Sequence, residues 1–280
     1  MSVVIAVMCH KGGAGKTTTV NSLAGYYSTN GKKVLIVDAD EQANIKTLFG
    51  MRLSNVDGGL ASILINNLMP ESMIQQTSFE NIDVILSGGR KMKEFEEAVF
   101  QRPDRYNLMS KSFASLKNKY DVILIDTPPA IGAISVNVVS FADYVLLVSE
   151  PDLLGALGAR ATEQFISKEV SIDLKLPTPK ILGVAFIRFD SRRVADHNAF
   201  DEMDTYASKG LLGGGKVFEP LRQDSKIRTA QARRKTIFHY APNSNVAQDY
   251  AKLGSQILEI IASDFEKKSN KNFNTADASL

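Results

Sequence analysis

The sequence has 280 residues, of which 44% are hydrophobic and 23% charged, with a formal charge of +2. A chain of this length and hydrophobic content can form one large α/β core or two small ones, and we expect one. No apolar run approaches the roughly 20 residues of a membrane helix, and no basic leader precedes the first apolar segment, so we expect a soluble cytoplasmic protein without membrane attachment. Cys9 is the single cysteine, which excludes an internal disulfide and a four-thiolate cluster within one chain.

The first predicted strand, residues 3–8, leads directly into a glycine-rich loop and the start of a helix. Glycines remove side chains where backbone N–H groups must converge on an anion, which is typical of a phosphate-binding loop. Lys16 would supply a point charge between the outer phosphates, and Thr17 a hydroxyl group to a magnesium ion. The fit to G-x-x-x-x-G-K-[ST] holds only with His10 in place of the first glycine.

The same loop carries a second lysine at its start, Lys11, in the pattern K-G-G-x-G-K-T. This pattern resembles the deviant Walker A motif of the ParA/MinD group of ATPases. The resemblance implies ATP or ADP and Mg²⁺ as ligands, and catalytic roles for Lys11 and Lys16. It also implies an ATP-bound homodimer, in which Lys11 reaches the phosphates held by the other subunit. The nucleotide-binding residues that it implies are Gly12, Gly13, Ala14, Gly15, Lys16, Thr17 and Thr18. The alternative is a glycine-rich turn that merely connects a strand to a helix, which leaves the spacing of the two lysines unexplained.

A helix over 18–28 and a buried parallel strand over 34–37 come next. The strand delivers the segment D-A-D-E-Q-A-N, residues 38–44, to its carboxyl end, where ligands bind in open parallel sheets. This segment resembles the D-x-D-P-Q-x-N element of ParA proteins, with Glu41 where proline is usual. The match implies that Asp40 orients or activates the attacking water and that Asp38 acts through water near the metal. Alternatively, both carboxylates cap the following helix, which Asp40 can do at the same time.

The pattern over residues 50–81 is mixed and predicts helices at 59–67 and 70–76. A predicted strand at 82–86, a charged helix at 91–100 and an amphipathic segment at 106–119 follow. The next strand, 120–125, ends in Asp126-Thr127-Pro128-Pro129. A short apolar strand that closes on an aspartate is the Walker B arrangement, in which the carboxylate holds a magnesium-bound water. Asp126 therefore joins Thr17 and Asp38 as a predicted metal-site residue. The alternative is an ordinary residue at a strand end.

A strand over 142–148, a helix over 151–168 and a strand over 181–187 precede a basic C-terminal third. There, residues 216–240 carry Lys216, Arg222, Lys226, Arg228, Arg233, Arg234 and Lys235 against only Glu219 and Asp224. Phosphate backbones bind such focused patches without base readout. Residues 221–237 also resemble a ParA segment whose basic residues bind nonspecific DNA. The candidate DNA contacts are Arg192, Arg193, Lys226, Arg228 and Arg233. Two alternatives are a solvated basic surface and contacts with the ribose and base of the nucleotide.

The chain closes with a predicted core helix over 246–262 and a polar, flexible tail over 263–280, which leaves a single ATPase domain over 1–262. MinD-type proteins end in a basic amphipathic helix that lies on the membrane. Because this tail offers only Phe265 and Phe273 among polar residues, it predicts no membrane binding.

The predicted elements together indicate a doubly wound α/β fold with a mostly parallel sheet and helices on both faces, of the P-loop type. The ParA resemblance implies an ATPase that is weak on its own, stimulated by a ParB-like partner, and associated with the nucleoid through nonspecific DNA. Its implied role is the partition of a plasmid or chromosome. Two alternatives are a related ATPase that positions a protein cargo on the nucleoid and a metabolic ligase of the dethiobiotin synthetase type.

Overall fold

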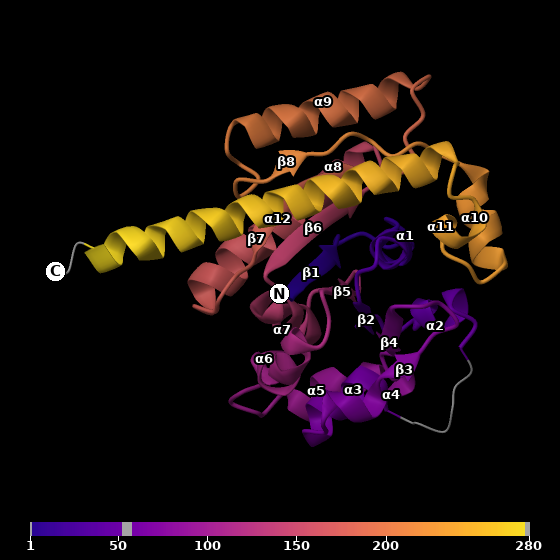
Figure 1. Cartoon of the computed structure of the whole chain (residues 1–280). Coiled ribbons are helices and arrows are strands. Elements are labelled where there is room, and N and C mark those ends of the chain that lie inside the picture. The colour runs from indigo at the N-terminus through magenta and orange to yellow at the C-terminus, as the bar shows by residue number, and fades with distance from the viewer. Residues whose placement is uncertain (1, 52–57, 278–280) are drawn as a thin grey trace.

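A mostly parallel sheet forms the centre of the molecule. The structure, a computed structural model, describes residues 2–51 and 58–277. Within these ranges the sheet has eight strands in the order β3-β4-β2-β5-β1-β6-β7-β8 (Figure 1). The strands are β1 (Val3–Met8), β2 (Val34–Asp38), β3 (Gln75–Gln76), β4 (Ile82–Ile85), β5 (Val122–Asp126), β6 (Tyr144–Ser149), β7 (Lys180–Phe186) and β8 (Lys216–Val217). The β3–β4 pair is antiparallel and the other pairs are parallel.

Helices cover both faces of this sheet, which confirms the predicted fold class. One face carries α1 (Lys16–Thr29), α2 (Asn44–Leu48), α10 (Ser225–Ala232), α11 (Ile237–Tyr240) and α12 (Asn245–Asp277). The other carries α3 (Gly59–Asn66), α4 (Arg90–Lys93), α5 (Phe95–Val99), α6 (Leu108–Phe113), α7 (Ala133–Phe141), α8 (Leu153–Gln164) and α9 (Val194–Ser208). The short 3₁₀ segments η1 (Pro70–Met73) and η2 (Ala114–Asn118) and the π-helix η3 (Phe165–Asp173) also lie on this second face.

The continuous apolar runs form strands because both faces of the sheet are buried. Successive side chains of a strand point to opposite faces. In β1, Val4, Ala6 and Met8 pack with α3–α9, whereas the alternate residues pack with α1 and α12. Strand β1 lies between β5 and β6, and the chain builds the sheet first on one side of β1 and then on the other. Ligands bind at such a reversal point, outside the carboxyl ends of the strands.

The C-terminal helix is longer than predicted. Instead of ending near residue 262, α12 continues to Asp277, and its end projects beyond the rest of the described chain (Figure 1). Two contacts hold the continuation: Asp264 accepts hydrogen bonds from Lys180 Nζ at 2.8 Å and Tyr144 Oη at 3.2 Å, and Phe265 packs on the core. Most of the predicted flexible tail is therefore helical, and residues 278–280 lie outside the described ranges.

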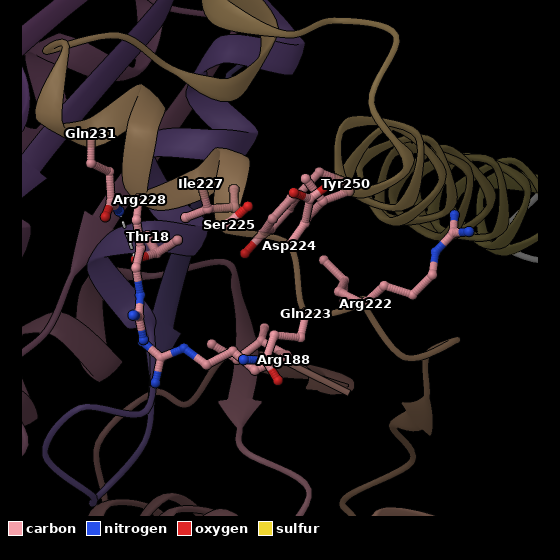
Figure 2. Close-up of a pocket in the computed structure, with 13 residues that line it drawn as sticks. Thr18, Arg188, Arg222, Gln223, Asp224, Ser225, Ile227, Arg228, Gln231 and Tyr250 are labelled. Carbon is pink, nitrogen blue, oxygen red and sulfur yellow. Dashed lines mark hydrogen bonds between the residues drawn. The ribbon is translucent and has the colours of Figure 1, made fainter. Parts of the chain in front are cut away.

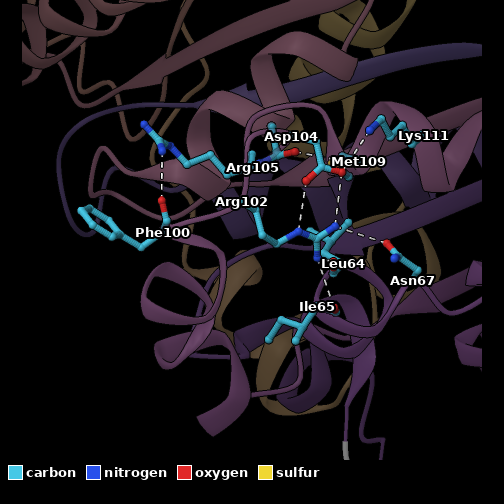
Figure 3. Close-up of polar contacts among 10 residues, drawn as sticks. Leu64, Ile65, Asn67, Phe100, Arg102, Asp104, Arg105, Met109 and Lys111 are labelled. Carbon is cyan, nitrogen blue, oxygen red and sulfur yellow. Dashed lines mark hydrogen bonds and ion pairs between the residues drawn. The ribbon is translucent and has the colours of Figure 1, made fainter.

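Arg102 ties the connection between α5 and α6 to the end of α3 (Figure 3). Its Nη1 donates to the carbonyl oxygens of Leu64 and Ile65, each at 3.2 Å, and so satisfies acceptors that a helix end leaves unpaired. Asp104 accepts from Arg102 Nε at 3.1 Å and from Lys111 Nζ at 3.0 Å. This ion-paired cluster holds α5 against the neighbouring helices.

Candidate functional site

The glycine-rich loop, residues 9–15, connects β1 to α1 at the carboxyl edge of the sheet. Gly13 has φ 74° and Gly15 has φ 81°, a region that side chains disfavour. A Cβ atom on Gly15 would also lie only 1.9 Å from Ile187 Cδ1. Helix α1 begins at Lys16. Its N-cap residue is Gly15, which has no side chain to accept hydrogen bonds from the first amides of the helix. These amides remain available to an anion.

Lys16 lies in the cleft that this loop encloses, and only 6% of it is exposed. Its Nζ donates to the carbonyl oxygens of Cys9 at 3.1 Å and Lys11 at 3.2 Å. Burial lowers the pKa of Lys16, while the neighbouring acidic groups oppose this shift. The cleft is lined by residues 12–18, Asp40, Gln42, Asn44, Thr47, Leu48, Pro129, Arg188 and Gln231. All predicted nucleotide-binding residues therefore meet in one cavity.

Two buried aspartates end adjacent strands beside the loop. Asp38 of β2 and Asp126 of β5 are register partners, and both are fully buried. Among the described residues, Asp38 Oδ2 and both carboxylate oxygens of Asp126 have no hydrogen-bond partner. Burial raises the pKa of Asp126 to about 7, against the opposing effects of Thr17 and Lys16. Burial, followed by the charge of Asp126, likewise raises the pKa of Asp38. Unpaired carboxylate oxygens beside Thr17 suit a hard divalent cation, so these residues fit Mg²⁺.

Asp40 lies in the turn between β2 and α2 and lines the same cleft. Its Oδ1 accepts from the amide of Gln42 at 2.9 Å, and its own amide donates to Asp38 Oδ1 at 3.1 Å. The residue at the N-cap position of α2 is Ala43, so neither aspartate occupies the capping position considered from the sequence. The Asp40 carboxylate is thus held beside the predicted metal site by its bond to Gln42.

Lys11 is held by acidic residues at the start of α8. Its Nζ lies 3.0 and 2.9 Å from the two carboxylate oxygens of Asp152, and 3.5 Å from Glu150 Oε2. Burial disfavours the Lys11 charge, but the hydrogen bond and charge of Asp152, with Glu150, outweigh it and raise the pKa of Lys11. Glu150 also pairs with Arg188, which donates to the Gly13 carbonyl at 3.4 Å. This four-residue network borders the loop and was not evident in the sequence.

A second cavity, beneath α10, continues from the loop (Figure 2). It shares Thr18, Arg188 and Gln231 with the first cleft, and Gln231 Nε2 donates to Thr18 Oγ1 at 2.9 Å. Figure 2 shows the side chains of Arg188 and Arg228 extending toward one another at its edge. The apolar part of the lining consists of Ile187, Leu221, Ile227, Val246 and Tyr250. Apolar walls with a few polar groups suit a planar base and its ribose.

The structure divides the predicted basic patch. Arg228 lines the second cavity, as in the alternative in which this segment contacts the nucleotide. Arg222 forms an ion pair with Asp249 of α12 at 2.6 Å, and its side chain points away from the cavity in Figure 2. The exposed candidates that remain on α10 and at its end are Lys226 and Arg233, the latter with its guanidinium 5.4 Å from the ring centroid of Tyr240.

Arg192 and Arg193, the other predicted DNA contacts, lie just before α9. Both pair with Asp190, at 2.8 and 3.7 Å. Their segment is joined to the segment before α10, because the Phe189 amide donates to the Leu221 carbonyl at 2.9 Å. The two predicted basic segments therefore come together in space, although Asp190 offsets part of the charge of the first.

The chain is similar to known proteins in both sequence and fold. A family model described as an AAA domain matches residues 2–175. The chain is 28% identical over 261 residues to the virulence plasmid ParA family protein pGP5-D of Chlamydia psittaci, covering 93% of this chain and 96% of that protein. The McdA(D38A)–ATP complex of Cyanothece superposes with a TM-score of 0.80 at 21% identity, over 93% of this chain and 96% of that one. The septum site-determining protein MinD of Pyrococcus horikoshii, complexed with Mg-ADP, gives a TM-score of 0.70 at 26% identity, over 92% and 96%. In the described ranges, no helix has the length and apolar character to cross a membrane.

Proposed function

The chain belongs to the ParA family of P-loop ATPases, which bind ATP or ADP with Mg²⁺. From this premise we propose that ATP binding switches a homodimer to a state that binds nonspecific DNA. The proposed role of this switch is to partition a plasmid or chromosome. The observation that carries this proposal is the contact between Gln231 and Thr18. It links the helix that bears Lys226 directly to the phosphate-binding helix α1. This contact supports the proposal that nucleotide binding and the position of the basic helix are coupled.

The nucleotide would occupy both cavities. We propose that residues 12–18 bind the phosphates and that Lys16 leaves the loop carbonyls to contact the outer phosphates. The base and ribose would enter the second cavity between Arg188 and Arg228. Thr17, Asp38 and Asp126 would hold Mg²⁺, which neutralises phosphate charge when bound. This placement is supported by the unpaired oxygens of the two aspartates.

Dimer formation would release Lys11 from its present partners. In the single chain, Asp152 and Glu150 hold the ammonium group. For Lys11 to reach the phosphates of the other subunit, as the family resemblance implies, these ion pairs must break. ATP-dependent association therefore competes with an intramolecular contact, and this contact disfavours the dimer when nucleotide is absent.

Replacing Asp152 by asparagine is expected to strengthen ATP-dependent dimerisation about two- to fivefold, the range for one partly exposed ion pair. The asparagine side chain can still accept the hydrogen bond that Asp152 accepts from the Gly155 amide, so the start of α8 should be retained. Sedimentation with a non-hydrolysable ATP analogue measures the dissociation constant. Glu219→Gln, which removes an ion pair with Lys252 instead, serves as the control. Unchanged or weaker association of Asp152→Asn would contradict the competition.

Hydrolysis would reopen the dimer and release DNA. We propose that Asp40 orients the attacking water, since its carboxylate is fixed beside the metal-site residues. Turnover would be slow in the isolated protein and accelerated by a ParB-like partner. Cycles of binding and release would then redistribute the protein over the nucleoid and move the cargo.

The double variant Lys226→Glu with Arg233→Glu is expected to lower the affinity for random-sequence DNA at least about tenfold in the presence of ATP, because it reverses two exposed charges. ATP binding should persist, since neither residue lines the nucleotide cavities. The log–log salt dependence should also become shallower by about 0.9 for each lost phosphate contact.

The measurement compares DNA binding with ATP, with ADP and without nucleotide. Arg228→Ala provides the contrast, because Arg228 lines the second cavity and its loss should weaken nucleotide binding first. DNA affinity that is identical in the three nucleotide states would refute the switch. An unaltered affinity of the double variant would instead remove α10 from the DNA surface.

A further inference from the structure

Helix α7 receives its N-terminal cap from a side chain of another helix. The amide of Ala133 donates to Glu96 Oε2 at 2.9 Å, and the amide of Ile134 donates to Glu96 Oε1 at 3.3 Å. The N-cap residue itself is Gly132, which has no side chain to supply the bonds. A carboxylate at this position satisfies amides that the helix leaves unpaired and interacts favourably with the helix dipole. Glu96 of α5 thus fixes the place where α7 begins.

Gly132 accommodates this carboxylate. Its φ of −172° is extended backbone that any residue adopts, so conformational freedom does not account for the glycine. A Cβ atom there would instead lie 2.4 Å from Glu96 Oε1. The absence of a side chain at residue 132 is what lets the carboxylate approach the helix end. The cap therefore depends on two residues far apart in the sequence.

A short loop, residues 127–132, connects Asp126 at the end of β5 to the start of α7. At the near end of this loop, Thr127 Oγ1 donates to the Val7 carbonyl at 2.8 Å. At the far end, the only side chain that bonds the first amides of α7 in the described chain is that of Glu96. Between these two ends, Ser135 Oγ donates to the Ala130 carbonyl at 2.8 Å. The loop also includes Pro129, which lines the phosphate cleft.

The same loop faces Asp40 across a cavity. Residues 128–132 form one side of this cavity, residues 39–42 form another, and Met92, Lys93 and Glu96 close it from α4 and α5. The position of the loop therefore sets the width of the space beside the Asp40 carboxylate. Arg102 in turn holds the segment that follows α5 against α3 (Figure 3). The Glu96 carboxylate is thus carried by a well-anchored element.

We propose that Glu96 is a positioning residue for ATP hydrolysis. By capping α7, it holds the loop at residues 128–132 at the separation from Asp40 that a hydrolytic water requires. It acts through this loop and contacts no predicted phosphate-binding residue. Displacement of a reacting group by about 1 Å costs up to about 100-fold in rate, so loosening one of several loop anchors is expected to cost less than this limit. The inference rests on the proposed role of Asp40 in ATP hydrolysis, but not on the proposed DNA switch.

Glu96→Ala is expected to lower kcat for ATP hydrolysis by the full chain about tenfold, with KM for ATP within twofold of the wild-type value. Glu96→Gln keeps one acceptor oxygen and should recover part of the loss. Glu97→Ala is the matched control, because this neighbouring carboxylate has no hydrogen-bond or ion-pair partner among the described residues. Hydrogen exchange at the amides of Ala133 and Ile134 should accelerate in Glu96→Ala and not in Glu97→Ala.

Gly132→Ala tests the same contact from the other side, because its new methyl group displaces the Glu96 carboxylate. It should lower kcat to a similar extent, and the double variant Gly132→Ala with Glu96→Ala should lose no more than Glu96→Ala alone. Additive losses would overturn the proposal. So would a Glu96→Gln variant that exchanges rapidly at Ala133 and Ile134 but retains wild-type kcat, or a loss confined to KM.

Discussion

Replacing Lys16 by alanine is expected to weaken ATP binding at least about 100-fold and to remove measurable hydrolysis. A charge-assisted hydrogen bond contributes about 1.5–3 kcal/mol, and the ammonium group would contact more than one phosphate oxygen. In the structure, Lys16 Nζ donates to the carbonyl oxygens of Cys9 and Lys11. Because these carbonyls attract the ammonium group less than phosphate does, the residue is poised to move without unfolding the loop.

Titration of a fluorescent ATP analogue measures this effect. Lys32→Ala is the matched control, because Lys32 is an exposed lysine just before β2. It lies near the amino end of this strand, whereas Asp38 lies at the carboxyl end. The loop should survive the Lys16 substitution, because Gly13 and Gly15 set its backbone conformation. Undiminished binding by Lys16→Ala would show that the phosphates lie elsewhere.

The phosphate loop and the central strands were predictable because their signals are local. The loop motif is contiguous, and each central strand is an uninterrupted apolar run because the sheet is buried on both faces. Asp38 and Asp126 followed from the same logic, since each ends such a run. Their roles in metal binding remain predictions that follow from position and chemistry.

The missed elements have weak or misleading local signals. Helix α7 contains Ile134, Val136, Val138 and Val139, whose β-branched side chains favour strands, and burial in the core overrides that preference. Strands β3 and β8 have two residues each, too short for any periodicity. The predicted helix over 70–76 is instead a 3₁₀ segment that leads into β3. In α9 only a few residues are buried, so its apolar stripe is faint.

The second half of the site could not be predicted because it depends on distant pairs. Lys11 and Asp152 are separated by 141 residues, and Thr18 and Gln231 by 213. From the sequence, Arg228 was one charge of a basic run with two alternative roles, whereas the structure places its side chain at the second cavity. Charge patterns report which residues are basic, but only the fold reports what each of them faces.

Replacing Asp40 by asparagine is expected to lower the rate of ATP hydrolysis about 100-fold or more while ATP binding persists. Asparagine retains an acceptor oxygen for the Gln42 amide, so the turn between β2 and α2 should keep its shape. It lacks the charge with which a carboxylate orients water and accepts its proton, a contribution of about 10²–10⁴ in rate. Single-turnover hydrolysis with a separate binding measurement distinguishes the two effects.

Glu80→Gln is the control for this variant. Glu80 is an exposed carboxylate that precedes β4 and lines neither of the cavities that Asp40 lines, so its loss should leave hydrolysis near the wild-type rate. If the proposed switch also holds, Asp40→Asn should remain dimeric and DNA-bound in ATP, because only hydrolysis reopens the dimer. Wild-type turnover by Asp40→Asn would remove this residue from the chemistry. Slow turnover with rapid DNA release would keep Asp40 in the reaction but separate hydrolysis from release.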